Sequence, residues 1–120
     1  MSSIRVVQIN ASDIRGGAAR AAYRLHSAGN AAGFASKMLV KKRFSRDPSV
    51  FVVEPSAERA RRWFRDRRSL RMQKDFARYH AVPRVDYDYF SDDRTVDGAD
   101  VARQLPPCDV INLHWIAGFV

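Results

Sequence analysis

The stretch INASDIRGGAARAAYRLH, residues 9–26, changes character at its middle, where Gly16 and Gly17 separate a polar segment from an alanine-rich one. Just before it, IRVVQIN at residues 4–10 is a nearly continuous apolar run that ends at a polar residue. Such a run is typical of a strand buried on both faces of a parallel sheet. The stretch therefore predicts a strand, a glycine turn and a helix, in that order.

The helix is expected over residues 18–32, followed by a stop at Gly33. We expect its buried arc to consist of small or apolar side chains, namely Ala18, Ala21, Ala22, Leu25 and Ala28, with Arg20 and Arg24 on the opposite side. The next segment, FASKMLV at residues 34–40, restores an extended apolar pattern. Together these segments predict a βαβ unit with a right-handed crossover.

The rest of the chain gives weaker patterns. Residues 50–53 predict a third strand or an edge piece, and 56–79 predict one helix or two, with Ser56 as N-cap and Glu58 in the first turn. Residues 80–98 are loop-like. A short helix is expected over 99–105, stopped by Pro106 and Pro107, and a second buried strand over 110–114.

Size and composition predict one small α/β domain built on an open parallel sheet. The chain has 120 residues, of which 46% are hydrophobic, enough for one core and too few for two. No run approaches the roughly 20 apolar residues that cross a bilayer, and the single cysteine, Cys108, has no partner for a disulfide. We expect a cytoplasmic protein.

The last predicted strand, at residues 110–114, is not followed by a helix that would cover it. We therefore also expect the chain to be a fragment of a longer protein.

The formal net charge of +8 is concentrated in one segment. Residues 58–78 contain nine basic side chains and three acidic ones, a balance of +6. Basic residues interleaved with Trp63, Phe64 and Phe76 suggest a nucleic-acid-binding module, although no recognition motif is present. The alternatives are a solvated helix face or contact with an anionic membrane.

The glycine turn is the first candidate site, because ligands of open α/β sheets lie at the carboxyl ends of the strands. Gly16 and Gly17 let a backbone approach a ligand closely, and the helix-opening amides from Ala18 onward favour an anion such as a phosphate or diphosphate. Upstream, a hydroxyl, a carboxylate and a guanidinium offer further contacts, from Ser12, Asp13 and Arg15. The spacing matches neither the dinucleotide fingerprint nor the P-loop. The alternative is a tight turn with a close helix–sheet contact.

His114 is the second candidate, since it stands at the carboxyl end of the last predicted strand, on the same rim as the glycine turn. The alternative is a histidine packed beside Trp115. His26 and His80 have no partners at metal-ligand spacing, so no metal site is predicted. No arrangement for a serine or cysteine nucleophile is evident, and the acids of SDDRTVDGAD, residues 91–100, suit a solvated loop.

Three stretches carry a resemblance to a known family. GGAARAAYRLH at 16–26, SKMLV at 36–40 and DVINLHWIAGF at 109–119 follow one another in an order and approximate spacing that resemble the amino-terminal part of a bacterial GT-B glycosyltransferase, in the group called glycosyltransferase family four. The segment between, 41–100, carries little that identifies it beyond DPSV and YFS.

The resemblance implies a retaining enzyme with twin Rossmann-like domains that needs no metal ion or other cofactor. Residues 1–120 would form a partial acceptor-side domain, with Gly16 and Gly17 near the donor diphosphate and His114 near the transferred sugar. The partners would be a nucleotide-sugar donor and a glycan or lipid-linked acceptor, in surface polysaccharide synthesis. Without the carboxyl-terminal donor domain, the chain is expected not to catalyse transfer alone. A Rossmann-like domain that binds another nucleotide, or a non-catalytic Rossmann-like remnant, stays open as an alternative.

Overall fold

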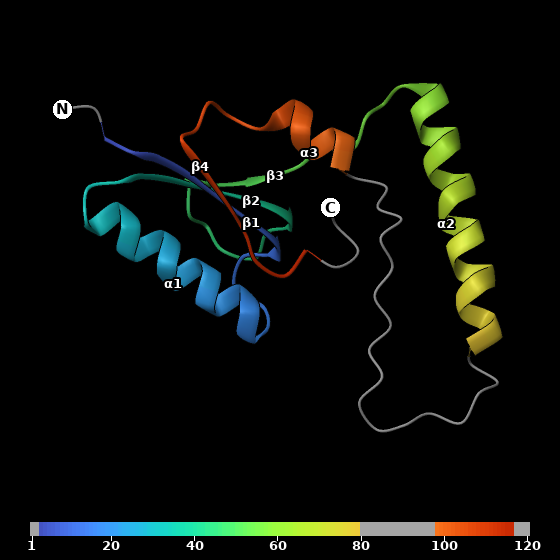
Figure 1. Cartoon of the computed structure of the whole chain (residues 1–120), viewed down its shortest axis with the longest axis horizontal. Coiled ribbons are helices and arrows are strands. Elements are labelled where there is room, and N and C mark those ends of the chain that lie inside the picture. The colour runs from blue at the N-terminus through green and yellow to red at the C-terminus, as the bar shows by residue number, and fades with distance from the viewer. Residues whose placement is uncertain (1–2, 80–97, 117–120) are drawn as a thin grey trace.

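The computed structural model describes residues 3–79 and 98–116 as an α/β arrangement (Figure 1). Along the chain the elements are β1 (Arg5–Ser12), α1 (Gly17–Ala31), β2 (Ala35–Lys42), β3 (Val50–Val52), α2 (Arg59–Tyr79), α3 (Gly98–Gln104) and β4 (Val110–Leu113). Residues 80–97 of the predicted loop, which include His80 and most of the acidic cluster, lie outside the described residues, and Gly98 already belongs to α3. Among the described residues, no helix combines the length and the apolar character needed to span a bilayer.

The four strands form one parallel sheet in the order β3-β2-β1-β4. Strand β1 occupies the interior, with Val7 paired to Lys37 of β2 on one side and to Ile111 of β4 on the other. This placement explains why residues 7–10 are all buried, as the continuous apolar run predicted. A Rossmann-like open parallel sheet with flanking helices is therefore confirmed, and the ambiguous segment at 50–53 forms an edge strand beside β2.

The sheet is covered on both faces by different helices (Figure 1). On one face, Ala22 of α1 packs with Met38, Val40 and Val50. On the other face, Val101 of α3 joins a cluster formed by Val7, Ile9, Leu39 and Val53. The half-buried Cys108 packs against this second cluster, which is a structural role for the chain's cysteine.

The buried arc of α1 differs from the expected one. Ala22 is buried as predicted, and the other buried positions are Ala19 and His26. The remaining four residues of the expected arc are exposed, namely Ala18, Ala21, Leu25 and Ala28. The prediction was wrong because it placed apolar residues inward, whereas two serine hydroxyls satisfy the nitrogens of His26 and make its burial favourable. The predicted helix stop is confirmed: Gly33 has φ 91 and directly follows the C-cap.

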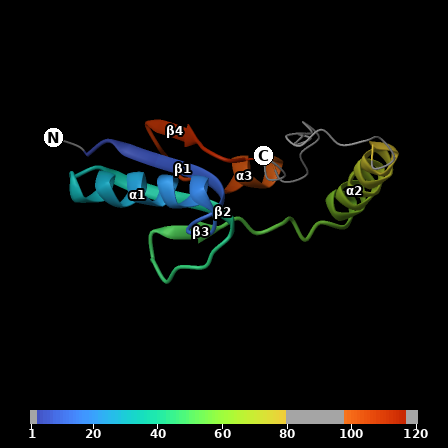
Figure 2. The ribbon, with the colours of Figure 1, turned by 90° about the horizontal axis from the view of Figure 1, so that it is seen from below.

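Helix α2 is a single continuous helix that stands away from the sheet, reached by an extended connection after β3 (Figure 2). Ser56 is not its N-cap, because the helix begins only at Arg59 and the Arg62 amide donates to the Glu58 carbonyl. Glu58 thus precedes the first turn and forms an ion pair with Arg61 at 2.9 Å. The backbone of Ser56 instead donates to the carboxylate of Asp100, which ties the connection to α3.

Candidate functional site

The two predicted site segments lie on the same rim of the sheet. Strands β1 and β4 are parallel neighbours, and their ladder continues past β4, since His114 N donates to Ile9 O at 3.0 Å and Ala11 N donates to Trp115 O at 2.9 Å. The residues after β4 therefore sit beside the end of β1, from which the glycine turn leads into α1. The topology brings His114 and the glycine turn together at the carboxyl ends of the strands, as expected.

The turn between β1 and α1 is closed locally and leaves the helix uncapped. The Ser12 hydroxyl donates to the Arg15 carbonyl at 2.9 Å. Gly16 then takes φ 94 and ψ 164, a conformation that is essentially restricted to glycine, and no side chain caps the helix. The first amides of an α-helix have no intrahelical acceptor, so the donors at this rim require an acceptor from outside the helix.

A larger residue at position 17 would not clash with the described part of the chain. A Cβ built on Gly17, or on Gly16, meets no atom of residues 3–79 and 98–116 within 4 Å. The close helix–sheet contact considered from the sequence is therefore absent here. Gly16 is required by its backbone angles, whereas Gly17 borders open space in which a ligand could approach the backbone.

That open space is a cavity of about 450 Å³. It is lined by residues 10–12 and 15–19 and by Trp115, so it spans the end of β1, the glycine turn and the segment after β4. The Arg15 guanidinium lies 3.9 Å from the ring centroid of Phe44, a cation–π contact that restrains it at the cavity. Helix-opening amides, a cationic side chain and an indole ring form an environment suited to an anion attached to a planar or apolar group.

Asp13 has a structural position instead of a place in the cavity. It is fully buried, and its carboxylate accepts hydrogen bonds from the backbone of Ile14, Phe44 and Ser45. Burial alone would raise the pKa of Asp13, but the hydrogen bonds from Ser45 and Phe44 bring that pKa below its ordinary value. The ionised carboxylate thus fastens the loop after β2 to the turn, and it supports the cavity indirectly.

His114 is held by a glutamine in the interior of β1. Its Nε2 lies 2.7 Å from Gln8 Oε1. Because an amide oxygen can only accept, Nε2 carries the proton and Nδ1 of the neutral ring is an acceptor. Burial lowers the pKa of His114, which favours this neutral form. His114 borders the cavity-lining Trp115 but does not itself line the cavity.

Gln8 and Asn10 were missed as site-supporting residues when the sequence was read as an apolar strand. Both are buried, and Asn10 Oδ1 accepts a hydrogen bond from Trp115 N at 2.8 Å. This bond fixes the segment that carries His114 and Trp115 against β1. The signal was present in the sequence, since residues 8, 10 and 12 are polar at the two-residue spacing of one strand face.

A second polar cluster links α1 to β2 and the start of β3, and it contains a serine, a histidine and an aspartate. His26 Nε2 lies 2.8 Å from Ser49 Oγ, and the Ser49 hydroxyl donates to Asp47. The serine proton therefore already points at the carboxylate, and His26 acts as a donor to Ser49 instead of a base for it. Since His26 is also fully buried, the cluster is structural.

The described residues contain no group of three or more His, Cys, Asp or Glu side chains placed to hold a metal ion. Comparison of the chain with known protein families, with curated proteins and with solved structures finds no match. The function therefore has to be argued from the cavity and its surroundings.

Proposed function

We propose that this chain is the acceptor-side part of a retaining GT-B glycosyltransferase and that its glycine-turn cavity binds the diphosphate of a nucleotide-sugar donor. The observation that carries the proposal is the cavity of about 450 Å³ at the N-terminus of α1, where no side chain caps the helix. Arg15 and Gly17 border this cavity, and a Cβ on Gly17 would meet none of the described atoms. The resemblance of the three sequence stretches supplies the class of reaction.

The chemistry of sugar transfer fits such a pocket. Departure of a nucleoside diphosphate builds negative charge on phosphate oxygens, and fixed donors that face this charge stabilise the transition state. The amides of Gly17 and Ala18 and the Arg15 guanidinium are the groups that would do so. Ser12, whose hydroxyl already donates to the Arg15 carbonyl, would shape the turn and offer its oxygen as an acceptor.

His114 would act on the sugar side. With Nε2–H committed to Gln8, the Nδ1 lone pair is the ring atom able to accept a hydrogen bond from a sugar hydroxyl. Asp13 is left out of the direct contacts, because backbone amides already occupy its buried carboxylate. The acceptor would be a glycan or lipid-linked sugar, and the setting would be cytoplasmic, where nucleotide sugars are made.

The binding step can be tested on this chain without turnover. We expect addition of UDP or GDP to shift the backbone amide NMR signals of residues 16–19, with a dissociation constant on the order of 1 mM. Gly17→Leu should weaken this binding at least about ten-fold by filling the space above the turn. Gly29→Ala is the matched control, since a Cβ there makes only ordinary contacts at 3.7 and 3.8 Å.

Two results would contradict the proposal: no shift at the turn with either nucleotide, or equal binding by wild type and a folded Gly17→Leu variant. In an enzyme that contains the donor domain, we further expect His114→Ala to lower sugar transfer about 100-fold. Unchanged transfer would show that His114 does not act in the site. The diphosphate site at the glycine turn is tested separately, by the nucleotide-binding measurement.

A further inference from the structure

One face of α2 combines positive charge and exposed apolar side chains with no acidic residue. At about 100° per residue, an arc of roughly 140° holds five basic side chains, from Arg59, Arg67, Arg71, Lys74 and Arg78. All five are exposed. Asp66 and Asp75 fall outside this arc, which we call the basic face of α2.

Three large apolar side chains share this face. Trp63, Phe64 and Leu70 are 51%, 66% and 56% exposed. Trp63 and Phe64 pack edge to face with ring centroids 4.9 Å apart, and the Arg67 guanidinium lies 4.7 Å from the Trp63 ring. Single exposed apolar residues are common, but three on one helix face form a patch that favours a partner.

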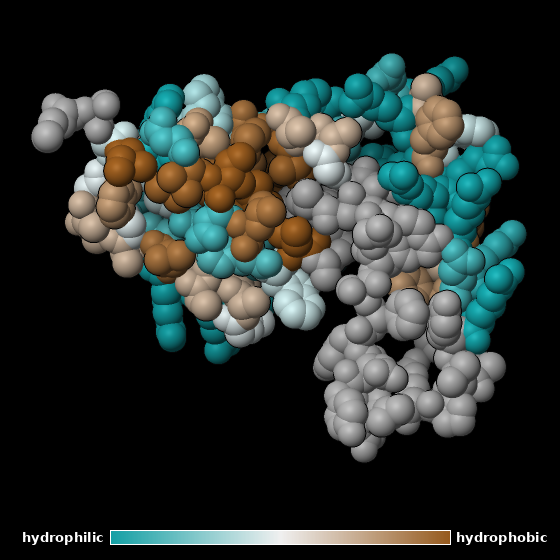
Figure 3. Space-filling model, in the orientation of Figure 1, coloured by the Kyte–Doolittle hydropathy of each residue, from teal (hydrophilic) through white to brown (hydrophobic). Residues whose placement is uncertain are grey.

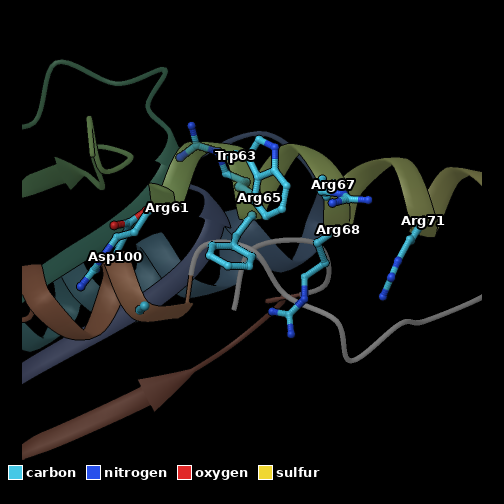
Figure 4. A pocket seen from close by; sticks show the side chains of 9 residues that line it. Arg61, Trp63, Arg65, Arg67, Arg68, Arg71 and Asp100 are labelled. Atoms are coloured by element: carbon cyan, nitrogen blue, oxygen red, sulfur yellow. The ribbon is translucent and has the colours of Figure 1, made fainter. Parts of the chain in front are cut away.

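The opposite side of α2 is different. Arg65, Ser69 and Met72 are half-buried, so the exposed patch is confined to one direction. Near α3 there is an open hollow of about 710 Å³ (Figure 4). It is lined by Trp63, Phe64 and five arginines of α2, of which Arg67 and Arg71 belong to the basic face, and by Ala99 and Asp100 of α3. The hollow gives negatively charged groups access between several guanidinium groups.

We propose that the basic face of α2 binds an anionic lipid surface, with α2 lying in the plane of the membrane interface. Trp63, Phe64 and Leu70 would enter the boundary between head groups and acyl chains, while the arginine and lysine side chains between and beside them extend their charges to the lipid phosphates. Leu70 decides between lipid and nucleic acid. It lies beside Trp63, about 20° away around the helix, and has no π surface on which a base could stack, whereas it suits an acyl chain.

The charge requirement is tested by sedimenting the full chain with vesicles of phosphatidylcholine containing about one third phosphatidylglycerol. We expect binding at low salt that falls steeply as salt rises, and little binding to pure phosphatidylcholine. Arg67→Ala should weaken binding about five-fold, the value of one basic residue at such a surface. Arg62→Ala removes the same charge from the same helix outside the basic face, and it should weaken binding less than about two-fold.

The apolar requirement is tested in a Trp115→Phe background, in which Trp63 is the remaining tryptophan. Its emission should shift to the blue on binding and be quenched by lipids brominated in the acyl chain. Leu70→Ala should weaken binding roughly five-fold. Leu25→Ala, at a 49% exposed position of α1, is the matched apolar control and should leave binding unchanged.

The proposal is overturned by absence of vesicle binding at low salt, by equal losses for Arg62→Ala and Arg67→Ala, or by lack of Trp63 quenching. A competition with single-stranded and duplex DNA completes the test. If nucleic acid displaces the vesicles and Leu70→Ala has no effect on either ligand, α2 is a nucleic-acid surface and the lipid assignment fails.

Discussion

His26 is fully buried in α1 although it is a polar side chain, because both of its ring nitrogens have partners. Nδ1 lies 2.8 Å from Ser36 Oγ and Nε2 lies 2.8 Å from Ser49 Oγ. The Ser49 hydroxyl donates to Asp47, so Nε2 is the protonated nitrogen and the ring is neutral. A second proton on the ring would make Nδ1 a donor, so the Ser36 hydroxyl would have to turn and accept instead.

The stability of the fold should accordingly fall below neutral pH. Burial lowers the pKa of His26 from its ordinary value of 6.5, with Asp47 acting in the opposite direction. Below about pH 6.5 the unfolded chain takes up a proton that the folded chain resists, so the free energy of unfolding decreases as pH falls. The free energies of unfolding in urea at about pH 7.5 and pH 5.5 should differ through His26 by at most about 1.4 kcal/mol, the limit for a histidine that takes up no proton in the folded state.

The His26→Gln variant should lose this part of the pH dependence, whatever its stability at neutral pH. His114 contributes in the same direction, since burial also lowers its pKa. Asp13 and Asp47 have lowered pKa values, so their contribution is lost only as pH falls through and below 3.8, outside this window. An unchanged slope between pH 7.5 and 5.5 in His26→Gln would contradict the lowered pKa of the buried His26.

The two glycines of the turn should respond differently to alanine. Gly16→Ala places a Cβ at φ 94 and ψ 164, which should destabilise the fold by about 1–3 kcal/mol. Gly17→Ala puts alanine at the first helical position in open space, and it should be neutral or stabilise by up to about 1 kcal/mol. Urea unfolding of the pair provides the measurement, and a larger loss for Gly17→Ala would contradict the turn geometry.

At the scale of residues, the glycine turn could be predicted from the sequence, but the roles of the buried polar side chains near it could not. Gly16 and Gly17 could be placed because glycines between a strand and a helix have a local conformational meaning. Asp13 and His26 could not, because their partners at residues 44–45 and 36 and 49 become neighbours only after the sheet forms. A carboxylate that binds backbone amides and one that binds a ligand look the same in sequence.

At the scale of elements, the strands and helices were predicted where the local pattern agrees with the final packing. Strand β1 lies in the sheet interior and reads as a continuous apolar run, and α3 is followed by a proline pair. Helix α2 could not be assigned to one helix or two, because its apolar residues do not follow one stripe. The structure explains this: α2 packs no continuous apolar face on the sheet.

Helix α2 should therefore unfold without unfolding the sheet. Leu70→Pro removes a hydrogen bond near the middle of α2 and costs about 3 kcal/mol of helix stability. We expect far-ultraviolet circular dichroism to lose the contribution of α2 while the melting temperature of the remaining fold changes little. Ala22→Pro, in the helix packed on Met38 and Val40, is the contrasting control and should unfold the α/β core.

At the scale of the whole molecule, the exposed edge of the sheet at β4 should determine whether the protein self-associates. Strand β4 is an edge of the sheet formed by the described residues, and Val110, Ile111 and Leu113 are 47%, 48% and 52% exposed. No charged residue occurs from 110 to 116. Figure 3 shows apolar side chains gathered over the sheet region, in contrast to the largely hydrophilic surface of α2. Natural sheets usually protect such an edge with charges or bulges.

Self-association through β4 is the consequence we expect, because an open edge offers unpaired backbone groups and apolar neighbours to a second copy. The weight-average sedimentation coefficient should rise between about 10 and about 500 μM, the range in which exposed strand edges associate. Leu113→Lys should suppress the rise by placing a charge on this edge. Leu25→Lys makes the same change at a 49% exposed position of α1, and it should have no effect. Equal behaviour of the two variants would show that association, if it occurs, uses another surface, and a constant sedimentation coefficient for the wild type would show that the edge is protected.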